Sequence, residues 1–495
     1  MTNITLQIGD VYTFQEKETG KWFAFQIVQI GEDKAVYVDL DYWSEMIPEE
    51  RDLYKMSYLR LNHHLWNNEI NQCWAPINFF PSNAKKVGNM AIRPLEECKR
   101  FGNWPKGSQQ KWTEKWAKLP EDQILAFKEA RTKWNETIIV AGKEVRKNLY
   151  GLFDDTLGAV SDFSEFDKLP GLGRITTTKD YPQLIPFLER RCLIQELVWD
   201  NCQRRELDLS RTHLEEVEIS GEDVESILLP SCVSHLTLRG KLSPNLRIYS
   251  PNDGYYMVLR VELHDDFLPN VGLSRLTNLH LTSIRDFNLK DIPSRYPGLT
   301  CLGLAGKPGY IREVAEISNL RELETLKMDD LFGFSADDFP HPESFTELRS
   351  LWLESVPADT GKIIKKLYKG KIQDLQVLKL RSVEWLHENL NNPLRNWDGS
   401  EFVPKSRYNK SVALWKETRR QMMEAASHAE LDFSAVKRIA IDYAEGFNKL
   451  DRRSSFIETE EREDIFNAFE QILNETGLSE FKKELIKLID EKRSW

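Results

Sequence analysis

Four stretches in the middle of the chain share one spacing of apolar residues. Residues 276–281 read LTNLHL, and the pattern returns as LTCLGL at 299–304, LETLKM at 323–328 and LRSLWL at 348–353. Side chains of a strand alternate between its two faces, so the apolar residues at the fourth and sixth positions point to the same side. One such unit cannot bury its own apolar edge. We therefore expect neighbouring copies to stack and share a continuous core.

Five further copies extend this pattern in both directions. They begin at Ile194, Leu214, Val233, Val258 and Leu375, and a weaker copy lies at Leu172 and Ile175. Successive copies of the nine begin 18 to 27 residues apart. The pattern resembles the leucine-rich repeat family, which implies an irregular leucine-rich repeat solenoid over residues 169–400. The fourth-position side chains are then expected to be almost inaccessible: Leu279, Leu302, Leu326, Leu351 and Leu378.

The side chains between the apolar positions are expected to face the concave surface of such a solenoid. An outward Trp is a typical anchor for a partner protein, and Trp352 holds one of these positions. Lys327 and Lys379 hold the equivalent position one copy to either side. The sequence therefore predicts that a partner binds Trp352, Lys327, Lys379, Glu218, Glu262 and His280. The alternative for Trp352 is a neighbouring region that folds over it.

A patch of small outward residues is predicted between the acidic and basic parts of this surface. It consists of Cys301, Gly303 and Ala305. Small side chains are expected to leave room there for a partner to approach closely.

Residues 1–115 are predicted to form a small antiparallel β domain, either a sheet or a partly closed barrel. Residues 10–14 and 22–30 have strand character on either side of a turn, and Phe23, Phe25 and Ile27 alternate onto one face. In the next strand Val36, Val38 and Leu40 alternate with Tyr37, Asp39 and Asp41. Further strands are expected at 74–80 and 91–93.

The start of this region carries a second resemblance. Gly9-Asp10-Val11, the turn and the strand Trp22-Phe23-Ala24-Phe25-Gln26-Ile27-Val28 resemble a bacterial immunity-protein family of polymorphic toxin systems. In that family a Gly-Asp opening precedes a strand of small and aromatic residues. The resemblance covers about a fifth of the chain and implies binding and neutralisation of a toxin, with no catalytic residue.

Helical patterns occupy the rest of the chain. Residues 116–168 are predicted to be a helical connector whose first helix starts at Pro120-Glu121-Asp122. Residues 401–495 are predicted to be a helical domain or a cap on the repeats. Their apolar stripes predict helices over 411–422, 434–447, 460–473 and 479–489, with Thr459 as an N-cap and Gly477 as a helix end.

Composition narrows the class of partner. The chain of 495 residues has 67 Lys and Arg against 78 Asp and Glu, a net charge of −11. Such a protein repels phosphate backbones, so no nucleic-acid partner is expected, and a basic protein partner would be steered towards it. No apolar run is long enough for a membrane span. The start of the chain lacks the features of a secretory signal, and the six cysteines lack CxxC spacing, so we expect a cytoplasmic protein with reduced thiols.

No catalytic, cofactor-binding or metal-binding residue is predicted. The chain contains no GxxxxGK[ST], HExxH or GxSxG motif. His63 and His64 are adjacent, so on a strand they would point to opposite faces, and no second pair completes a tetrahedral metal site.

These observations predict a non-catalytic protein-binding protein, in particular a bacterial immunity protein that neutralises a cognate toxin. The first alternative is a leucine-rich repeat adaptor or scaffold for another cellular protein. The second is an enzyme with an unrecognised site between the N-terminal sheet and the helical region.

Overall fold

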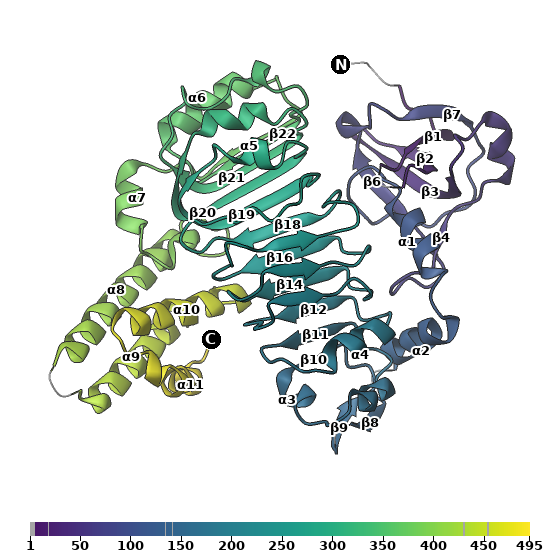
Figure 1. Cartoon of the computed structure of the whole chain (residues 1–495). Coiled ribbons are helices and arrows are strands. Elements are labelled where there is room, and N and C mark those ends of the chain that lie inside the picture. The colour runs from purple at the N-terminus through teal and green to yellow at the C-terminus, as the bar shows by residue number, and fades with distance from the viewer. Residues whose placement is uncertain (1–4, 18, 134, 141, 429–430, 453–454) are drawn as a thin grey trace. The chain divides into compact units, whose positions relative to one another are not determined.

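The computed structural model describes residues 5–17, 19–133, 135–140, 142–428, 431–452 and 455–495. The chain divides into two compact units, Met1–Val377 and Leu378–Trp495. An antiparallel sheet, a large parallel sheet and a set of helices follow one another along the chain (Figure 1). This order agrees with the mixed α/β organisation predicted from the sequence.

The N-terminal sheet is antiparallel and has the strand order β6-β3-β2-β1-β7. Its strands are β1 (Asp10–Gln15), β2 (Trp22–Ile30), β3 (Lys34–Ser44), β6 (Gln72–Pro76) and β7 (Lys85–Asn89). A small ribbon of β4 (Arg60–Leu61) and β5 (Glu69–Ile70) separates β3 from β6 in the sequence. The strands predicted at 10–14, 22–30 and 36–40 are confirmed. Residues 91–93 form no strand, because β7 already occupies the place beside β1.

Both faces of this sheet are buried. Phe25 and Ile27 pack on one face with Trp104, and Leu40 packs on the other with Met56. The alternation predicted for β3 therefore does not separate buried from exposed residues. Asp39 is 0% exposed and accepts a 2.7 Å hydrogen bond from Nδ2 of Asn71, and burial raises the pKa of Asp39 to about 6.

Two helices on either side of the predicted boundary at residues 115–116 pack against the start of the repeats. They are α1 (Ser108–Trp116) and α2 (Glu121–Thr132), which follows Pro120 as predicted. Trp116 and Phe127 share a buried cluster with Cys192 and Leu193. A hairpin of β8 (Thr137–Val140) and β9 (Lys143–Arg146), the helix α3 (Asp154–Leu157) and a short helix (Phe163–Lys168) complete the connector. The connector is therefore only partly helical, in contrast to the helical connector predicted.

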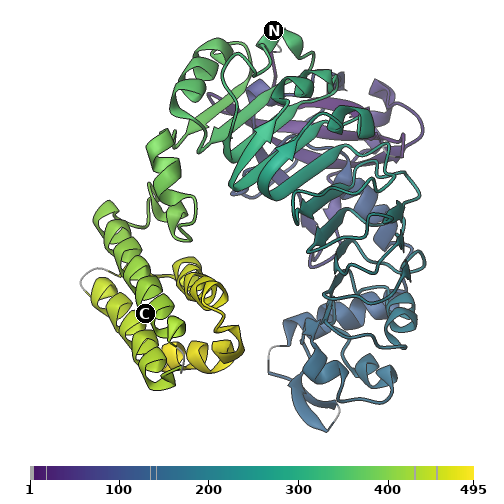
Figure 2. The same ribbon diagram turned by 60° about the vertical axis from the view of Figure 1, so that its left-hand side comes forward.

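The large sheet has eleven strands in the order β10-β11-β12-β14-β16-β18-β19-β20-β21-β22-β23. From β10 to β22 all neighbours are parallel, and consecutive copies of the repeat lie side by side (Figure 1, Figure 2). The strands are β10 (Gly151–Leu152), β11 (Arg174–Thr177), β12 (Glu196–Trp199), β14 (Glu216–Ser220), β16 (His235–Arg239), β18 (Val258–Glu262), β19 (Asn278–Asn288), β20 (Cys301–Arg312), β21 (Thr325–Phe332), β22 (Ser350–Glu354) and β23 (Asp374–Leu378).

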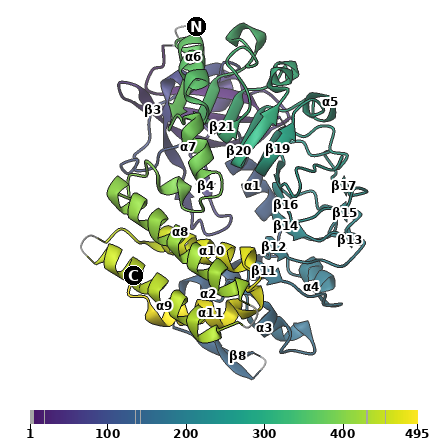
Figure 3. The same cartoon turned by 90° about the vertical axis from the view of Figure 1, so that its left-hand side faces the viewer.

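The connections between these strands contain further short elements. A separate parallel sheet of β13 (Glu206–Asp208), β15 (Ser226–Leu228) and β17 (Arg247–Tyr249) runs along the early copies (Figure 3). The helices in these connections are α4 (Leu184–Arg190), α5 (Ile292–Arg295) and α6 (Ala358–Tyr368).

Seven of the nine copies have the predicted register. Leu279, Leu302, Leu326 and Leu351 pair in sequence across β19 to β22, and each is 0% exposed. Their burial follows from the sharing of one core between neighbouring strands.

The fourth copy begins two residues earlier than predicted. Leu236 pairs with Leu259, and Leu238 pairs with Val261. Leu259 and Val261 therefore hold the two inward positions, which the prediction gave to Val261 and Leu263. Apolar residues hold every second position from Met257 to Leu263, so their spacing alone fits both registers.

The ninth copy begins three residues earlier than predicted. The carbonyl oxygen of Arg349 accepts from the backbone N–H groups of Gln373 and Asp374. The carbonyl oxygen of Glu324 accepts from Arg349 and Ser350 in the same way, so Asp374 aligns with Ser350. Val377 is consequently the inward residue. The prediction that Leu378 is buried is wrong, since it is 40% exposed.

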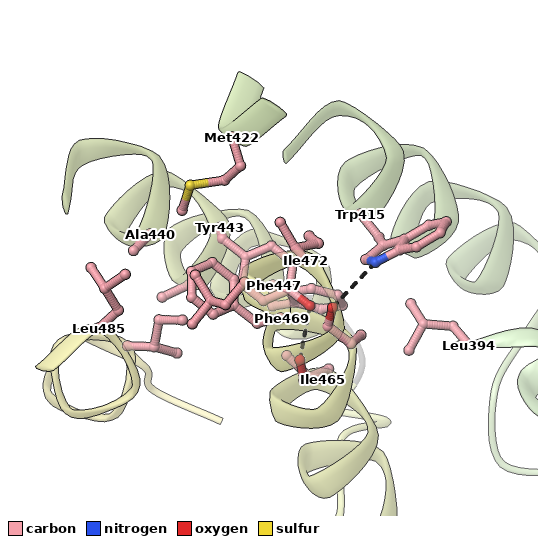
Figure 4. Close-up of a cluster of buried hydrophobic side chains, with 14 of the residues drawn as sticks. Leu394, Trp415, Met422, Ala440, Tyr443, Phe447, Ile465, Phe469, Ile472 and Leu485 are labelled. Atoms are coloured by element: carbon pink, nitrogen blue, oxygen red, sulfur yellow. Dashed lines mark hydrogen bonds between the residues drawn. The ribbon is translucent and has the colours of Figure 1, made fainter. Parts of the chain in front are cut away.

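The second unit is helical and has its own core. Its helices are α7 (Val383–Asn389), α8 (Lys405–Ser427), α9 (Phe433–Asp451), α10 (Thr459–Glu475) and α11 (Lys482–Lys492). Figure 4 shows Tyr443, Phe447 and Phe469 together in this core. The Tyr443 hydroxyl donates to the carbonyl oxygen of Ile465 at 2.9 Å.

The helices predicted over 434–447 and 460–473 correspond to α9 and α10. The helix α8 begins before its predicted start at residue 411, and α11 begins after residues 479–481, which form a separate short helix. The helix α7 was not predicted, since it lies within the predicted repeats. The predicted N-cap of α10 is also wrong. Glu458, and not Thr459, is the N-cap of α10, and it forms a capping box with Glu461. Gly477 follows this helix with a φ of 73°, the left-handed conformation that glycine adopts without strain. Among the described residues, no helix has both the length and the apolar character needed to cross a membrane.

Candidate partner-binding surface

The large sheet presents a face of mostly polar side chains, opposite to its inward residues. Strand register aligns one residue from each of seven consecutive strands along the middle of this face. We call this the central row: Glu218, Thr237, Arg260, His280, Gly303, Lys327 and Trp352. Neighbouring members are separated by about one strand spacing, ~4.8 Å.

Trp352 and Lys327 are partners at one end of the central row. The Nζ atom of Lys327 lies 5.7 Å from the centre of the Trp352 ring. Nε1 of Trp352 donates to a carboxylate oxygen of Glu354 at 3.2 Å. Trp352 is half-buried and Lys327 is exposed. Trp352 thus faces outward beside Lys327, as their positions in the repeat predict.

His280 fills the gap predicted at Gly303. A Cβ atom on Gly303 would lie 2.2 Å from Nδ1 of His280, so the imidazole lies against the glycine backbone. The expectation of an open patch at this point is therefore wrong. Burial, reinforced by the positive charges of Arg260 and Lys327, lowers the pKa of His280.

The two predicted acidic residues are bonded within the sheet itself. Glu218 forms an ion pair with Arg239, which also lies 3.4 Å from Asp200. Glu262 accepts a 3.3 Å hydrogen bond from the hydroxyl of Ser283. Glu262 lies on β18 but outside the central row, which Arg260 occupies on that strand.

Lys379 does not flank Trp352. In the corrected register Gln376 takes the position beside Trp352, and β23 ends at Leu378. Lys379 has a φ of 43° and lies two residues after the inward Val377, just as Ser355, with a φ of 52°, lies two residues after Leu353. The backbone turns away from the sheet at this position, and that turn removes Lys379 from the row.

Arg260 was not among the predicted binding residues. It is exposed at the centre of the central row, between Thr237 and His280. Among the described residues its side chain has no ion pair, whereas Arg239 one strand earlier pairs with two carboxylates. The signal for Arg260 in the sequence was its position directly before the apolar Val261, which places it on the outward face of the fourth copy.

His63 and His64 do not have the geometry assumed from the sequence. They lie in a turn, not on a strand, and their Nδ1 atoms are 2.7 Å apart. Within the described ranges, no group of three or more His, Cys, Asp or Glu residues is arranged to hold a metal ion.

Two hollows lie in the first unit away from the central row. One of about 510 Å³ is lined by β2, β3 and residues 92–98, and one of about 460 Å³ is lined by Arg131 and residues 145–150. Neither of these two is lined by a histidine.

No family model matches the chain, and no curated protein matches it.

Proposed function

We propose that the chain is a non-catalytic protein-binding protein whose recognition surface is the central row. The observation that carries this proposal is the alignment of two exposed cations, Arg260 and Lys327, with the half-buried ring of Trp352. Tryptophan combines a large rigid ring with an N–H donor, and such residues contribute much of the binding free energy at protein interfaces.

The repeat region is proposed to be a leucine-rich repeat solenoid. Support comes from the fourth-position leucines, which pair in register from Leu279 to Leu351, and from the second parallel sheet that β13, β15 and β17 form along the early copies. Such a stack offers a long continuous surface on one side, which suits recognition of a protein.

The partner is proposed to be a cognate toxin, and the protein a bacterial immunity protein acting in the cytoplasm. The support is the resemblance of the first β1–β2 hairpin to an immunity family, together with the acidic net charge of −11. The second candidate, an adaptor for another cellular protein, uses the same surface and differs in the identity of the partner.

Co-expression with the product of the neighbouring gene tests this proposal. The expected result is that the neighbouring product arrests growth alone, and that growth is restored and both proteins co-purify when the present chain is added. Trp352→Ala should lose the rescue, whereas Tyr249→Ala, an aromatic that is 58% exposed on β17, should retain it. A neighbouring product that is harmless, or toxic but not bound, would contradict the immunity role.

A further inference from the structure

Two cations of the central row stay outside ion pairs among the described residues. Arg260 on β18 and Lys327 on β21 are both exposed. Arg239, one strand before Arg260, lies instead against the carboxylates of Glu218 and Asp200. The charges of Arg260 and Lys327 are therefore available to a molecule that docks on the row.

The imidazole of His280 lies between these two cations in the row. Burial lowers the pKa of His280, and the positive charges of Arg260, Lys327 and His235 lower it further. His280 is consequently a neutral hydrogen-bonding group at neutral pH, and it lies on the backbone of Gly303. The middle of the row therefore combines a positive potential with a neutral polar ring.

A third cation acts on the same part of the sheet. Lys106, just before α1, is exposed. Burial raises the pKa of the Cys301 thiol on β20, Lys327 and Lys106 oppose this rise, and Glu324 adds to it. Since Cys301 lies two residues before a member of the row, the positive region extends beyond the row itself.

Acidic residues lie beside the row and are held within the chain. The next outward residues on three of its strands are Glu262, Asp329 and Glu354. Glu262 accepts from the hydroxyl of Ser283 at 3.3 Å, and Glu354 accepts from Nε1 of Trp352 at 3.2 Å. This acidic line repels anions, so it confines the anionic groups of a partner to the row.

The spacing of the two cations selects among anionic partners. Arg260 and Lys327 are three strand spacings apart, about 14 Å. An extended peptide advances about 3.4 Å per residue and turns alternate side chains to one side, so residues i and i+4 span this distance. Duplex DNA carries one charge per roughly 1.7 Å of its axis, so two cations this far apart would leave most phosphates uncompensated.

We propose that the central row binds an extended acidic segment of its partner. Two carboxylates four residues apart contact Arg260 and Lys327, and an apolar residue two positions further on packs on Trp352. This inference rests on the proposed function and adds the chemistry of the partner.

The net charge of −11 does not oppose this contact at physiological salt. Ions screen charges beyond about 8 Å, whereas a carboxylate in contact with Arg260 or Lys327 is much closer. The net charge and the row therefore act over different distances, and a partner that is basic overall can present an acidic segment to the row.

Selection of random peptides displayed on phage against the immobilised full chain tests the proposal. Enriched peptides should carry two acidic residues four apart, with an apolar residue two positions after the second. The most enriched peptide is then made with a fluorescent label, and its Kd is measured by anisotropy. This Kd should rise at least about tenfold in Arg260→Glu and in Lys327→Glu, because each change replaces an attraction by a repulsion.

Two charge reversals outside the row are matched controls. Lys290 and Arg321 are exposed cations in connections between strands, and Lys290→Glu and Arg321→Glu should leave the Kd of the peptide within about twofold of wild type. An equal rise in these controls would overturn the proposal, since the effect would then come from the net charge.

The Trp352→Ala variant separates this inference from the proposed function. Peptides that bind Trp352→Ala as tightly as wild type would contradict the proposed function, because they would not use the row. Binding that is lost in Trp352→Ala but kept in Arg260→Glu and Lys327→Glu would keep the surface and overturn the acidic segment. A selection that enriches no acidic pattern, or a peptide that oligothymidylate displaces at equal charge, would overturn it as well.

Discussion

Lys327 and Trp352 are register partners on β21 and β22, with the Lys327 ammonium 5.7 Å from the centre of the indole ring. A cation over a Trp ring at an exposed site contributes about 0.5–1 kcal/mol. The indole N–H is held at the same time by Glu354. The ring is thus fixed in orientation before any partner arrives, which reduces the entropy lost on binding.

The corrected register of the ninth copy predicts different costs for two chemically identical substitutions. Leu351→Ala should lower the free energy of unfolding by about 2–5 kcal/mol, because the side chain is 0% exposed and its removal leaves a cavity. Leu378→Ala should cost less than about 1 kcal/mol, because that side chain is 40% exposed. Urea unfolding of each variant, compared with wild type, measures the two changes in free energy. Equal costs would support the register predicted from the sequence, in which Leu378 points inward.

The buried carboxyl group of Asp39 predicts a pH-dependent gain in stability on substitution. The pKa of Asp39 is raised by burial from 3.8 to about 6, so the folded state binds the proton more tightly than the unfolded state. The stability that this proton contributes is fully present below about pH 3.8 and is lost as the pH rises through 6. Asp39→Asn, which resembles the protonated form, should therefore unfold like wild type near pH 4 but be more stable by up to roughly 3 kcal/mol near pH 8. Urea unfolding at both pH values measures this, and an equal difference at both would contradict it.

The contact between His280 and Gly303 predicts a coupling between two substitutions. Gly303→Ala alone should cost about 1–3 kcal/mol, because its Cβ would lie 2.2 Å from Nδ1 of His280. In a His280→Ala background the clash is absent, and the cost should fall by at least about 1 kcal/mol. Unfolding free energies of the two single variants and the double variant measure the coupling. Additive costs would show that the imidazole does not lie on the glycine.

The net charge of −11 predicts an effect on the rate of encounter. A basic partner should associate more slowly as salt rises, because ions screen charges beyond about 8–10 Å. Stopped-flow association at several salt concentrations measures this. An association rate that does not change with salt would indicate that the net charge serves solubility alone.

The strands of the large sheet were predictable because each copy places its apolar residues at fixed spacing. Errors arose where apolar residues occur at more positions than one register needs. Apolar residues hold every second position from Met257 to Leu263, and Leu375, Val377 and Leu378 lie within four residues. In both places only hydrogen bonding to the neighbouring strand decides which residues point inward.

Part of the candidate site was also predictable, because the spacing of the apolar residues sets which side chains face outward. Trp352 and Lys327 lie in copies with correct registers, whereas Lys379 lies in the misplaced one. The 3.4 Å contact between Nε2 of His64, in a turn, and Oε2 of Glu215, just before β14, could not be predicted, since 151 residues separate them in the sequence. The burial of Asp39 could not be predicted either, because the sequence of one strand does not show that both faces of its sheet are covered.

Calorimetry with the product of the neighbouring gene tests the central claim most directly. If the central row is the recognition surface, Trp352→Ala should raise Kd at least about 30-fold, the loss of 2–4 kcal/mol that an anchoring aromatic gives. Tyr249→Ala, an exposed aromatic on β17, should leave Kd within about twofold of wild type. Unchanged affinity of a folded Trp352→Ala variant would contradict the account and place recognition elsewhere on the chain.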